Sequence, residues 1–503
     1  MKKNIVIIFV FFLSAMMVQS AFAQKTKKTS PKQGHELKFL VKDAKDSILY
    51  LAVHFRDKLI LKDSVRPSGY GKYIFAGDTP YQDGLYMLIN QNKRPYLNFV
   101  IDKNQHFAIT CDTTGGVNDV IIVGSPENVE LLKFQQKSVQ SQKRVKALRD
   151  ERAKAQEAGD KELVRSCNEQ LEEVNKEMEQ FINDLIDANP DYLFSKMQKA
   201  YKMIEVPAPP VKEDGTIDSN FQAIYYRTHY WDNVDLSDGR LLYTPALEPK
   251  INEYFLKILF YQESDTICKY VDMVLNRAEK DSVSYRFFLE WISYKFESSK
   301  ILGHDAVFVH IVKNNQLKNK ATWMDEDLVR KYEKRVKNLE PLLIGKTAVE
   351  LIIPDTTQSD DFTRWYSSYG FSKPYVILWF YDPDCPTCTK ETMKMKVLYD
   401  SLERAGTRNF DIYGVAAEKD INRWKKYLKE KQLPWLNVGG LKANVDYMSA
   451  YNIYETGTPS MFIMDNRTRK IILNKRIDME QVPEFLRHYE KVENYKKQQQ
   501  QKK

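Results

Sequence analysis

Apolar and polar positions alternate along residues 35–123 of the chain. A period of two places the apolar side chains on one face, which is typical of strands with one buried side. Turn residues such as Ser68-Gly69 and Gly77-Asp78 separate the alternating stretches. We therefore predict a small antiparallel β-domain over 35–123, arranged as a sandwich or a barrel.

After Gly124 the spacing of apolar residues changes to three and four, which indicates helices. Between Val164 and Leu185 the two spacings alternate, and a weaker seam of matching spacing runs from Leu131 to Ala155. Gly159-Asp160 separates the seams, so the simplest structure is an antiparallel helical hairpin whose seams face each other. The alternative is that residues 127–187 form an intermolecular coiled coil, which would make the protein a dimer.

Aromatic residues recur at helical spacing between 220 and 343, for example at Phe287, Phe288 and Trp291. Stripes of this kind usually form helix cores rather than cofactor sites. Together with the hairpin they predict an α-helical domain over 124–343.

Strand and helix patterns alternate along residues 345–490. The run Tyr375–Tyr381 is continuously apolar, as in a central strand buried on both faces, and Phe410–Ala417 is similar. Helical patterns follow both runs, and a strand pair and a terminal helix complete the segment. This order predicts a mixed α/β sheet with covered faces. The remaining elements are expected at Thr387–Arg404, Asp420–Gln432, Trp435–Val438, Ser460–Asp465, Lys470–Ile477 and Met479–Val492.

The two ends of the chain differ from the rest in composition. Lys2 and Lys3 precede an apolar run of about 14 residues, shorter than the roughly 20 that span a bilayer, and Ala21-Phe22-Ala23 provides a cleavage pattern. Residues 1–23 are therefore predicted to be a signal peptide, and a retained N-terminal anchor is the alternative. We expect the mature protein in the periplasm or cell envelope, without stable membrane insertion. Residues 491–503 are polar and repetitive and are expected to form a disordered tail.

Composition excludes several classes of protein. The chain has 503 residues, of which 43% are hydrophobic and 29% are charged, and this fits a globular protein rather than a disordered one. Five cysteines are too few for a scaffold stapled by disulfides. The net charge of +8 is small for this length and scattered, so it does not support a nucleic-acid partner.

The segment Cys385-Pro386-Thr387-Cys388 carries the clearest chemical signal, because it lies where a buried strand gives way to a helix. Two cysteines three residues apart at a helix start can close a disulfide with little backbone strain. Because a helix N-terminus stabilises a thiolate, Cys385 is expected to have a lowered pKa and to act as the nucleophile. Cys388, one turn further on, would resolve the mixed disulfide. Pro386 stiffens the loop where a helix tolerates proline.

Two other interpretations of the cysteine pair stay open, namely half of a zinc site and an inert structural disulfide. Zinc needs four ligands, and Cys111, Cys167 and Cys268 fall in other predicted domains, so we expect no metal site. Cys167 occupies a seam position of the hairpin, and all three isolated cysteines are expected to be buried. The chemistry would then need no cofactor beyond the redox-active disulfide Cys385–Cys388.

The buried strand, the CPTC segment at a helix start and Thr458-Pro459 before a later strand resemble the thioredoxin superfamily. Phe380 and Glu391 bring residues 345–490 closer to the TlpA/ResA-like envelope thiol-disulfide oxidoreductases. A β-domain and an α-helical domain upstream of it resemble the multidomain thioredoxin-like proteins of Bacteroidetes.

The resemblance implies roles for further residues and for partners. Thr458-Pro459 matches the family's cis-proline position facing the cysteine pair, where the preceding residue's backbone pairs with an extended substrate segment. Glu391 matches an acid near the redox pair that tunes thiol ionisation or moves a proton. Pro386 and Thr387, between the cysteines, would shape the same surface. The implied partners are client protein disulfides and a membrane-bound electron donor.

These observations predict an exported protein thiol-disulfide oxidoreductase that works as a reductase. A disulfide oxidase or isomerase is the alternative within the same chemistry, because the direction depends on redox potential. A non-catalytic binding protein that uses the thioredoxin fold as an interaction module is a third interpretation. Asp382 and Asp384 precede the nucleophile, and two acids at this place are expected to oppose its thiolate.

Overall fold

The structure, a computed structural model, describes residues 34–501 apart from 212, 214, 319, 359–362 and 441. The chain forms two compact units. The first holds the residues up to Ile204 together with Arg240–Lys250, and the second holds Glu205–Gly239 and the chain from Ile251 onward. The predicted signal peptide, residues 1–23, lies outside the described residues.

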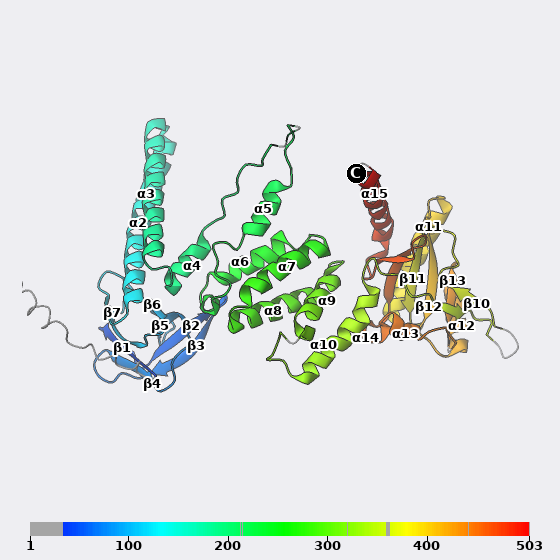
Figure 1. The fold of residues 1–503 in the computed structure, drawn as a ribbon, viewed down its shortest axis with the longest axis horizontal. Helices are drawn as coiled ribbons and strands as arrows, with labels where there is room; N and C mark the ends of the chain where they lie inside the picture. The colour runs from blue at the N-terminus through cyan, green and yellow to red at the C-terminus, as the bar shows by residue number, and fades with distance from the viewer. Residues whose placement is uncertain are drawn as a thin grey trace, which may run out of the picture. The chain divides into compact units, whose positions relative to one another are not determined.

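Two four-stranded sheets open the first unit and are blue in Figure 1. Their strands are β1 (His35–Lys42), β2 (Leu49–Phe55), β3 (Lys58–Val65), β4 (Lys72–Gly77), β5 (Gly84–Asn90), β6 (Pro95–Ile101), β7 (His106–Asp112) and β8 (Ile121–Val123). The strand orders are β4-β1-β7-β8 and β3-β2-β5-β6. Residues of both sheets, among them Phe39, Leu51 and Phe99, share one buried cluster, so the predicted β-domain is a sandwich.

One strand pair departs from the antiparallel arrangement that the alternation predicts. β1 and β7 run parallel, with Leu37 opposite Phe107 and Val41 opposite Cys111. The other pairs of the two sheets are antiparallel. Parallel neighbours need a crossover connection, and the strands from β2 to β6 provide it. Alternation shows which face is buried, and it contains no information about the direction of a distant partner.

The helical hairpin predicted around Gly159 follows the sheets and rises from them in Figure 1. It consists of α2 (Pro126–Ala158) and α3 (Lys161–Ala188). Gly159 has a left-handed φ of 73° and ends α2, and the Asp160 side chain accepts a hydrogen bond from Leu163 N–H at the start of α3. Cys167 and Val174 are buried in the seam between the helices.

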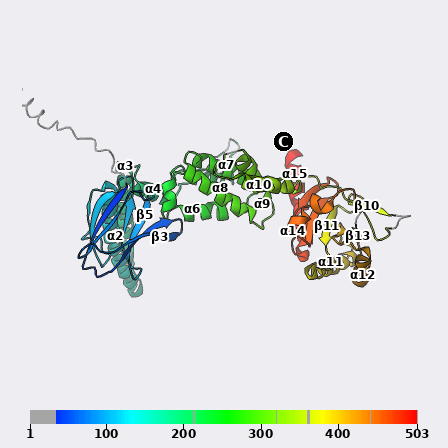
Figure 2. The same ribbon diagram turned by 90° about the horizontal axis from the view of Figure 1, so that it is seen from below.

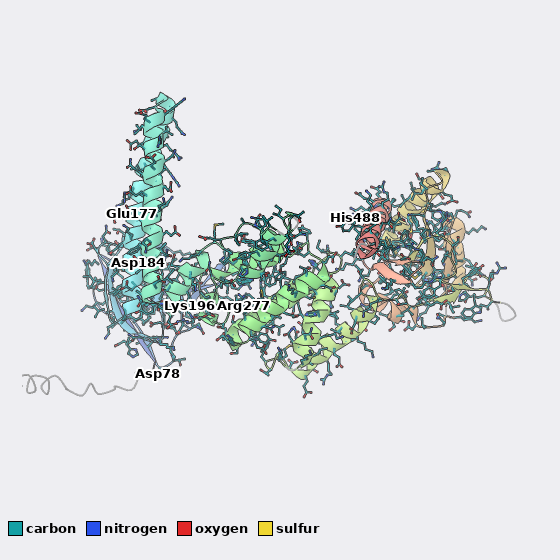
Figure 3. The ribbon with its side chains drawn as sticks, turned by 45° about the horizontal axis from the view of Figure 1, so that its top comes forward. Asp78, Glu177, Asp184, Lys196, Arg277 and His488 are labelled. Carbon is teal, nitrogen blue, oxygen red and sulfur yellow. The ribbon has the colours of Figure 1, made fainter. Side chains whose placement is uncertain are left out.

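An ion pair and a hydrogen bond between side chains connect the two helices beside this seam. Glu177 of α3, labelled in Figure 3, accepts a hydrogen bond from Arg144 of α2 at 2.9 Å. Further along, Arg152 donates to Asn168 at 3.0 Å. The seam and these pairs are made within one chain, so the intramolecular hairpin accounts for the apolar pattern.

The base of the hairpin is bound to its own unit. Asn128 of α2 donates to and accepts from the backbone of Val100 on β6, both at 2.7 Å. Glu127, which is buried, accepts a hydrogen bond at 2.8 Å from Phe194 N–H in α4 (Leu193–Tyr201). The hairpin and α4 therefore group with the sheets, whereas most of the later residues of the range 124–343, predicted as one domain, belong to the second unit.

Helices form the first half of the second unit. They are α5 (Phe221–His229), α7 (Ser264–Ala278), α8 (Ser282–Glu297), α9 (His304–Asn314) and α10 (Glu326–Leu339), while α6 (Leu247–Glu253) spans the point where the chain passes between the units. Figure 2 shows α7, α8 and α9 packed together.

Phe288 and Trp291 of α8 are buried, as the aromatic stripes predict. The helices share this unit with the C-terminal sheet, and the boundary predicted at 343–345 lies within it and stays a prediction.

A five-stranded mixed sheet of order β13-β12-β11-β14-β15 forms the C-terminal part. Its strands are β11 (Tyr375–Tyr381), β12 (Phe410–Ala416), β13 (Leu436–Gly439), β14 (Ser460–Asp465) and β15 (Lys470–Leu473), and a small two-stranded sheet contains β9 (Ile352–Pro354) and β10 (Trp365–Ser367). β11, β12 and β13 are parallel to their neighbours, whereas β14 and β15 run antiparallel. The helices are α11 (Pro386–Arg404), α12 (Ile421–Lys431), α13 (Tyr447–Ala450), α14 (Ile453–Thr456) and α15 (Val482–Gln501).

The central strand β11 is buried along its whole length. Ile377, Trp379 and Tyr381 point into a core with α11 and α12, whereas Leu378 and Phe380 belong to the core on the other face. A strand buried on both faces explains the continuous apolar run in the sequence. This strand ends directly before the loop that carries the cysteine pair.

The terminal helix corrects the prediction for the last residues. A disordered tail was expected over 491–503, but α15 continues to Gln501. Lysine and glutamine have good helix propensity, so a helix that has begun on a packed turn can extend through them.

Candidate functional site: the cysteine pair at the start of α11

Cys385 and Cys388 lie at the junction of β11 and α11. Cys385 is the N-cap of the helix, and its sulfur accepts a hydrogen bond from Cys388 N–H at 3.2 Å. Pro386 is the first helical residue, where the missing N–H of proline has no cost because that group lacks a partner in any helix. Both cysteines are free thiols. The first sulfur thus lies at the positive end of the helix, as the sequence predicts.

The two sulfurs differ in exposure. Cys385 is partly exposed, whereas Cys388 is 0% exposed. Burial, and secondly the hydrogen bond with Cys385, raise the pKa of the Cys388 thiol to about 11. An incoming disulfide can therefore reach Cys385, and Cys388 stays protonated behind it.

The loop before β14 lies against the buried sulfur. The peptide bond Thr458–Pro459 is cis, and the interaction of the Thr458 side chain with the Cys388 thiol lowers the pKa of that thiol against the effect of burial. Pro386 and Thr387 are exposed beside the first sulfur. The structure thus brings together Cys385, Cys388, Thr458 and Pro459, and places the two residues between the cysteines on the accessible surface.

Glu391 does not join this group. It lies one turn beyond Cys388, and its carboxylate forms an ion pair with Lys394 at 3.1 Å. No hydrogen bond between Glu391 and either thiol occurs in the described residues. The structure therefore shows Glu391 as a partner of a neighbouring lysine on the same helix.

The two acids before the nucleophile are arranged differently from the expectation. Asp382 accepts a hydrogen bond from Asp384 N–H at 2.9 Å, which shapes the turn. Asp384 itself forms an ion pair with Arg423 of α12 at 2.9 Å. Its negative charge is therefore compensated rather than directed at Cys385 alone. The sequence did not indicate this arginine, because it lies in another helix.

The sequence also did not indicate a group of buried aromatic side chains close to the cysteines. Tyr427 of α12 stacks on Tyr381, with ring centroids 5.7 Å apart, and burial raises the pKa of the Tyr427 hydroxyl. Tyr381 donates to Asn437 and accepts from Trp424, both at 3.0 Å. Trp424 and Tyr427 are three residues apart, so their spacing could have predicted that both lie on the buried face of the helix expected over 420–432.

A buried contact anchors the first turns of α11 to the sheet. The indole of Trp379 donates to the Thr392 hydroxyl at 3.0 Å, and both residues are 0% exposed. Thr392 follows Cys388 by one turn. The helix that carries the cysteines is therefore tied to the central strand by a hydrogen bond as well as by packing.

The other cysteines lie away from this site. Cys111 and Cys167 are buried as expected, but Cys268 is partly exposed. Burial raises the pKa of Cys111 and of Cys268 to about 12 in each case. No group of three or more His, Cys, Asp or Glu side chains suited to a metal occurs in the part of the chain that the structure describes. Among the same residues, no helix has the length and apolar character needed to cross a membrane.

Two family models match the chain. Residues 344–472 match the AhpC/TSA family, and residues 164–339 match a domain of unknown function, DUF5106. No curated protein matches. The helices of the second unit thus overlap a family without an assigned role, whereas the cysteine pair lies in the AhpC/TSA match.

Solved structures from Bacteroides and Cytophaga species are among those similar to this chain. A thioredoxin-like protein of Bacteroides caccae is 16% identical, with 57% of this chain and 99% of that chain covered and a TM-score of 0.42. A domain of a possible thiol-disulfide isomerase of Cytophaga hutchinsonii is 33% identical, with 31% and 98% covered and a TM-score of 0.26. The thioredoxin domain of a thiol-disulfide oxidoreductase of Bacteroides vulgatus is 26% identical, with 28% and 95% covered and a TM-score of 0.24.

The family match coincides with the mixed sheet and the cysteine pair at its central strand, and the 33% identity extends over nearly the whole Cytophaga domain. The C-terminal part of this multidomain chain belongs to the thioredoxin superfamily.

Proposed function

We propose that this chain is an exported thiol-disulfide oxidoreductase that reduces disulfides of client proteins through Cys385 and Cys388. The difference between the two sulfurs carries the proposal. Cys385 is accessible at the helix start and accepts a backbone N–H, while Cys388 is buried one turn further on. The names of the Cytophaga and Bacteroides vulgatus proteins support the same class of chemistry.

In the proposed reaction the Cys385 thiolate attacks one sulfur of a client disulfide. The client S–S bond breaks, a mixed disulfide forms, and the released client thiolate takes up a proton. Cys388 then loses its proton, and its sulfur attacks Cys385, which closes the Cys385–Cys388 disulfide and releases the second client thiol. Two electrons pass from the cysteine pair to the client.

The Thr458–Pro459 loop and the residues between the cysteines would guide the client. Thr458 lies beside Cys388, and Pro386 and Thr387 are exposed next to Cys385. An extended client segment could pair with the backbone before Pro459, in the manner of strand addition. No cofactor is required, because a partner dithiol, proposed to be membrane-bound, would restore the reduced pair.

Trapping of clients tests the chemistry directly. In the full chain, Cys388→Ser should retain clients as mixed disulfides on Cys385, while Cys385→Ser should trap none. Capture by neither variant, or insulin reduction that is unchanged when both cysteines are replaced by serine, contradicts the proposal and supports a binding protein instead.

The direction of electron flow is tested by the redox potential of the pair. Equilibration with glutathione buffers should give a value near or below about −200 mV for a reductase. A value close to about −120 mV, typical of a strong oxidant, would assign oxidation instead.

Export is part of the proposal and rests on residues 1–23. Expression of the full chain should yield a mature protein that begins at Gln24 in the periplasmic fraction. A cytoplasmic product that still begins at Met1 would contradict export. It would not contradict the proposed thiol chemistry, which the trapping experiment tests independently.

A further inference from the structure

Arg423 of α12 contacts the loop that carries the nucleophile. Its guanidinium lies 2.9 Å from Asp384, 3.1 Å from Glu418 and 3.6 Å from Asp420. Asp384 directly precedes Cys385 in the chain. One cation therefore contacts three acids, and one of these acids directly precedes Cys385 in the chain.

The other two acids hold the guanidinium in place. Glu418 is 8% exposed and accepts a hydrogen bond from Asp420 N–H at 2.7 Å. Asp420 is the N-cap of α12 and accepts from the N–H groups of Asn422 and Arg423. These contacts fix the first turn of the helix, so Arg423 is presented toward Asp384 from a rigid support.

The acid is equally fixed on its side. Asp384 N–H donates to the Asp382 carboxylate at 2.9 Å, and Cys385 N–H donates to the Asp382 carbonyl at 3.2 Å. The turn thereby fixes the backbone of Asp384, the residue that directly precedes Cys385 in the chain. A free carboxylate at this place would oppose a thiolate, because like charges close together disfavour each other's ionised form.

We infer that Arg423 is a positioning residue that compensates the charge of Asp384 and so preserves the reactivity of Cys385. This inference deepens the proposed function, since it takes Cys385 as the attacking sulfur. The remaining charged groups nearby already have partners: Asp382 is bound in the turn, and Glu391 is paired with Lys394. Arg423 thus supplies the compensating cation for the acid next to the nucleophile.

The size of the effect follows from solvent exposure. The side chains of Arg423 and Asp384 are 57% and 63% exposed, so water screens their attraction. An exposed pair of this kind supports a change of about two- to fivefold in rate, which becomes smaller at high salt.

The test measures alkylation of Cys385 by iodoacetamide in the reduced full chain at pH 7 and low salt, by mass spectrometry of the Cys385 peptide. Arg423→Gln should slow it by about two- to fivefold. The redox potential of the pair should become more negative, because the thiolate form of the reduced state loses stabilisation. Removing the acid as well, in Asp384→Asn with Arg423→Gln, should restore the wild-type rate.

Arg467→Gln is the matched control. Arg467 is 61% exposed and pairs with Asp465 at 3.1 Å. Asp465 lies opposite Tyr375, where β11 begins, whereas the cysteines follow Tyr381 at the other end of the strand. This variant should leave both the alkylation rate and the potential unchanged.

Two results would overturn the inference: an unchanged rate in Arg423→Gln, or a double variant as slow as the single one, which would indicate a packing role. These outcomes are distinct from failure of the proposed function. If the wild-type chain neither traps nor reduces clients but the alkylation pattern holds, the role of Arg423 stands and the reductase assignment falls.

Discussion

The amide N–H of Cys388 donates to the sulfur of Cys385 across 3.2 Å, while the side chain of Cys388 is fully buried. Cys388 therefore donates a backbone hydrogen bond to the sulfur of Cys385, while its own sulfur is inaccessible to solvent. This arrangement supports the proposed order, in which Cys385 reacts first and Cys388 second.

We expect iodoacetamide to label Cys385 well before Cys388 in the reduced, folded chain at pH 7. Burial raises the pKa of Cys388 to about 11, which leaves a thiolate fraction of about 10⁻⁴ at neutral pH. Labelling is followed by peptide mass spectrometry, with the urea-unfolded chain as a control in which both cysteines react. Equal rates in the folded chain would contradict the assigned order.

Replacing Thr392 by valine should destabilise the C-terminal sheet by about 1–3 kcal/mol, because the buried indole N–H of Trp379 loses its acceptor. Thr392→Ser keeps a hydroxyl and is the matched control, with a smaller loss. Urea unfolding followed by tryptophan fluorescence measures both. A valine variant as stable as the wild type would show that this hydrogen bond contributes nothing.

Glu127 should make the first unit less stable as the pH rises. Burial raises the pKa of this carboxyl to about 7 in the folded chain, so the folded state binds a proton that the unfolded state, near its usual 4.5, releases. The stabilisation is complete below pH 4.5 and is lost as the pH rises through 7, with a total of roughly 3 kcal/mol.

The measurement is hydrogen exchange of the α2 and α4 peptides in the full chain between pH 5 and 8, corrected for the intrinsic exchange rate. Glu127→Gln keeps an acceptor for Phe194 N–H and removes the titration, so its protection should change little with pH. A pH dependence identical to that of the wild type would place its origin elsewhere, for example at Asp102, whose pKa burial also raises.

Gly159→Ala should cost about 1 kcal/mol, because the residue ends α2 at a left-handed φ of 73°. No neighbouring atom would meet an added Cβ, so the cost comes from the backbone alone. Gly159→Asn, which tolerates this conformation better, should cost less. Thermal unfolding followed by circular dichroism compares them, and an alanine variant at least as stable as the asparagine variant would contradict the explanation.

Local patterns in the sequence predicted the local elements well. The apolar run Tyr375–Tyr381 and the segment Ser460–Asp465 coincide with β11 and β14, and the regular seam gave the hairpin on either side of Gly159. The parallel pairing of β1 with β7 was not predictable, because strand direction depends on chain segments that lie between them.

The same distinction applies to the candidate site. The cysteines and Thr458-Pro459 are motifs that can be read from neighbouring residues. The contact of Arg423 with Asp384 joins residues 39 positions apart and appears only when α12 packs beside the loop. Lys394, by contrast, follows Glu391 by three residues, so their pairing on one helix could have been anticipated.

The hydrogen bond from Trp379 to Thr392 places an indole beneath the helix whose first turn holds both sulfurs. Opening or closing the sulfur–sulfur link would change the surroundings of that indole without any added label. We therefore expect the fluorescence of Trp379, one of seven tryptophans in the chain, to change with the oxidation state of the pair.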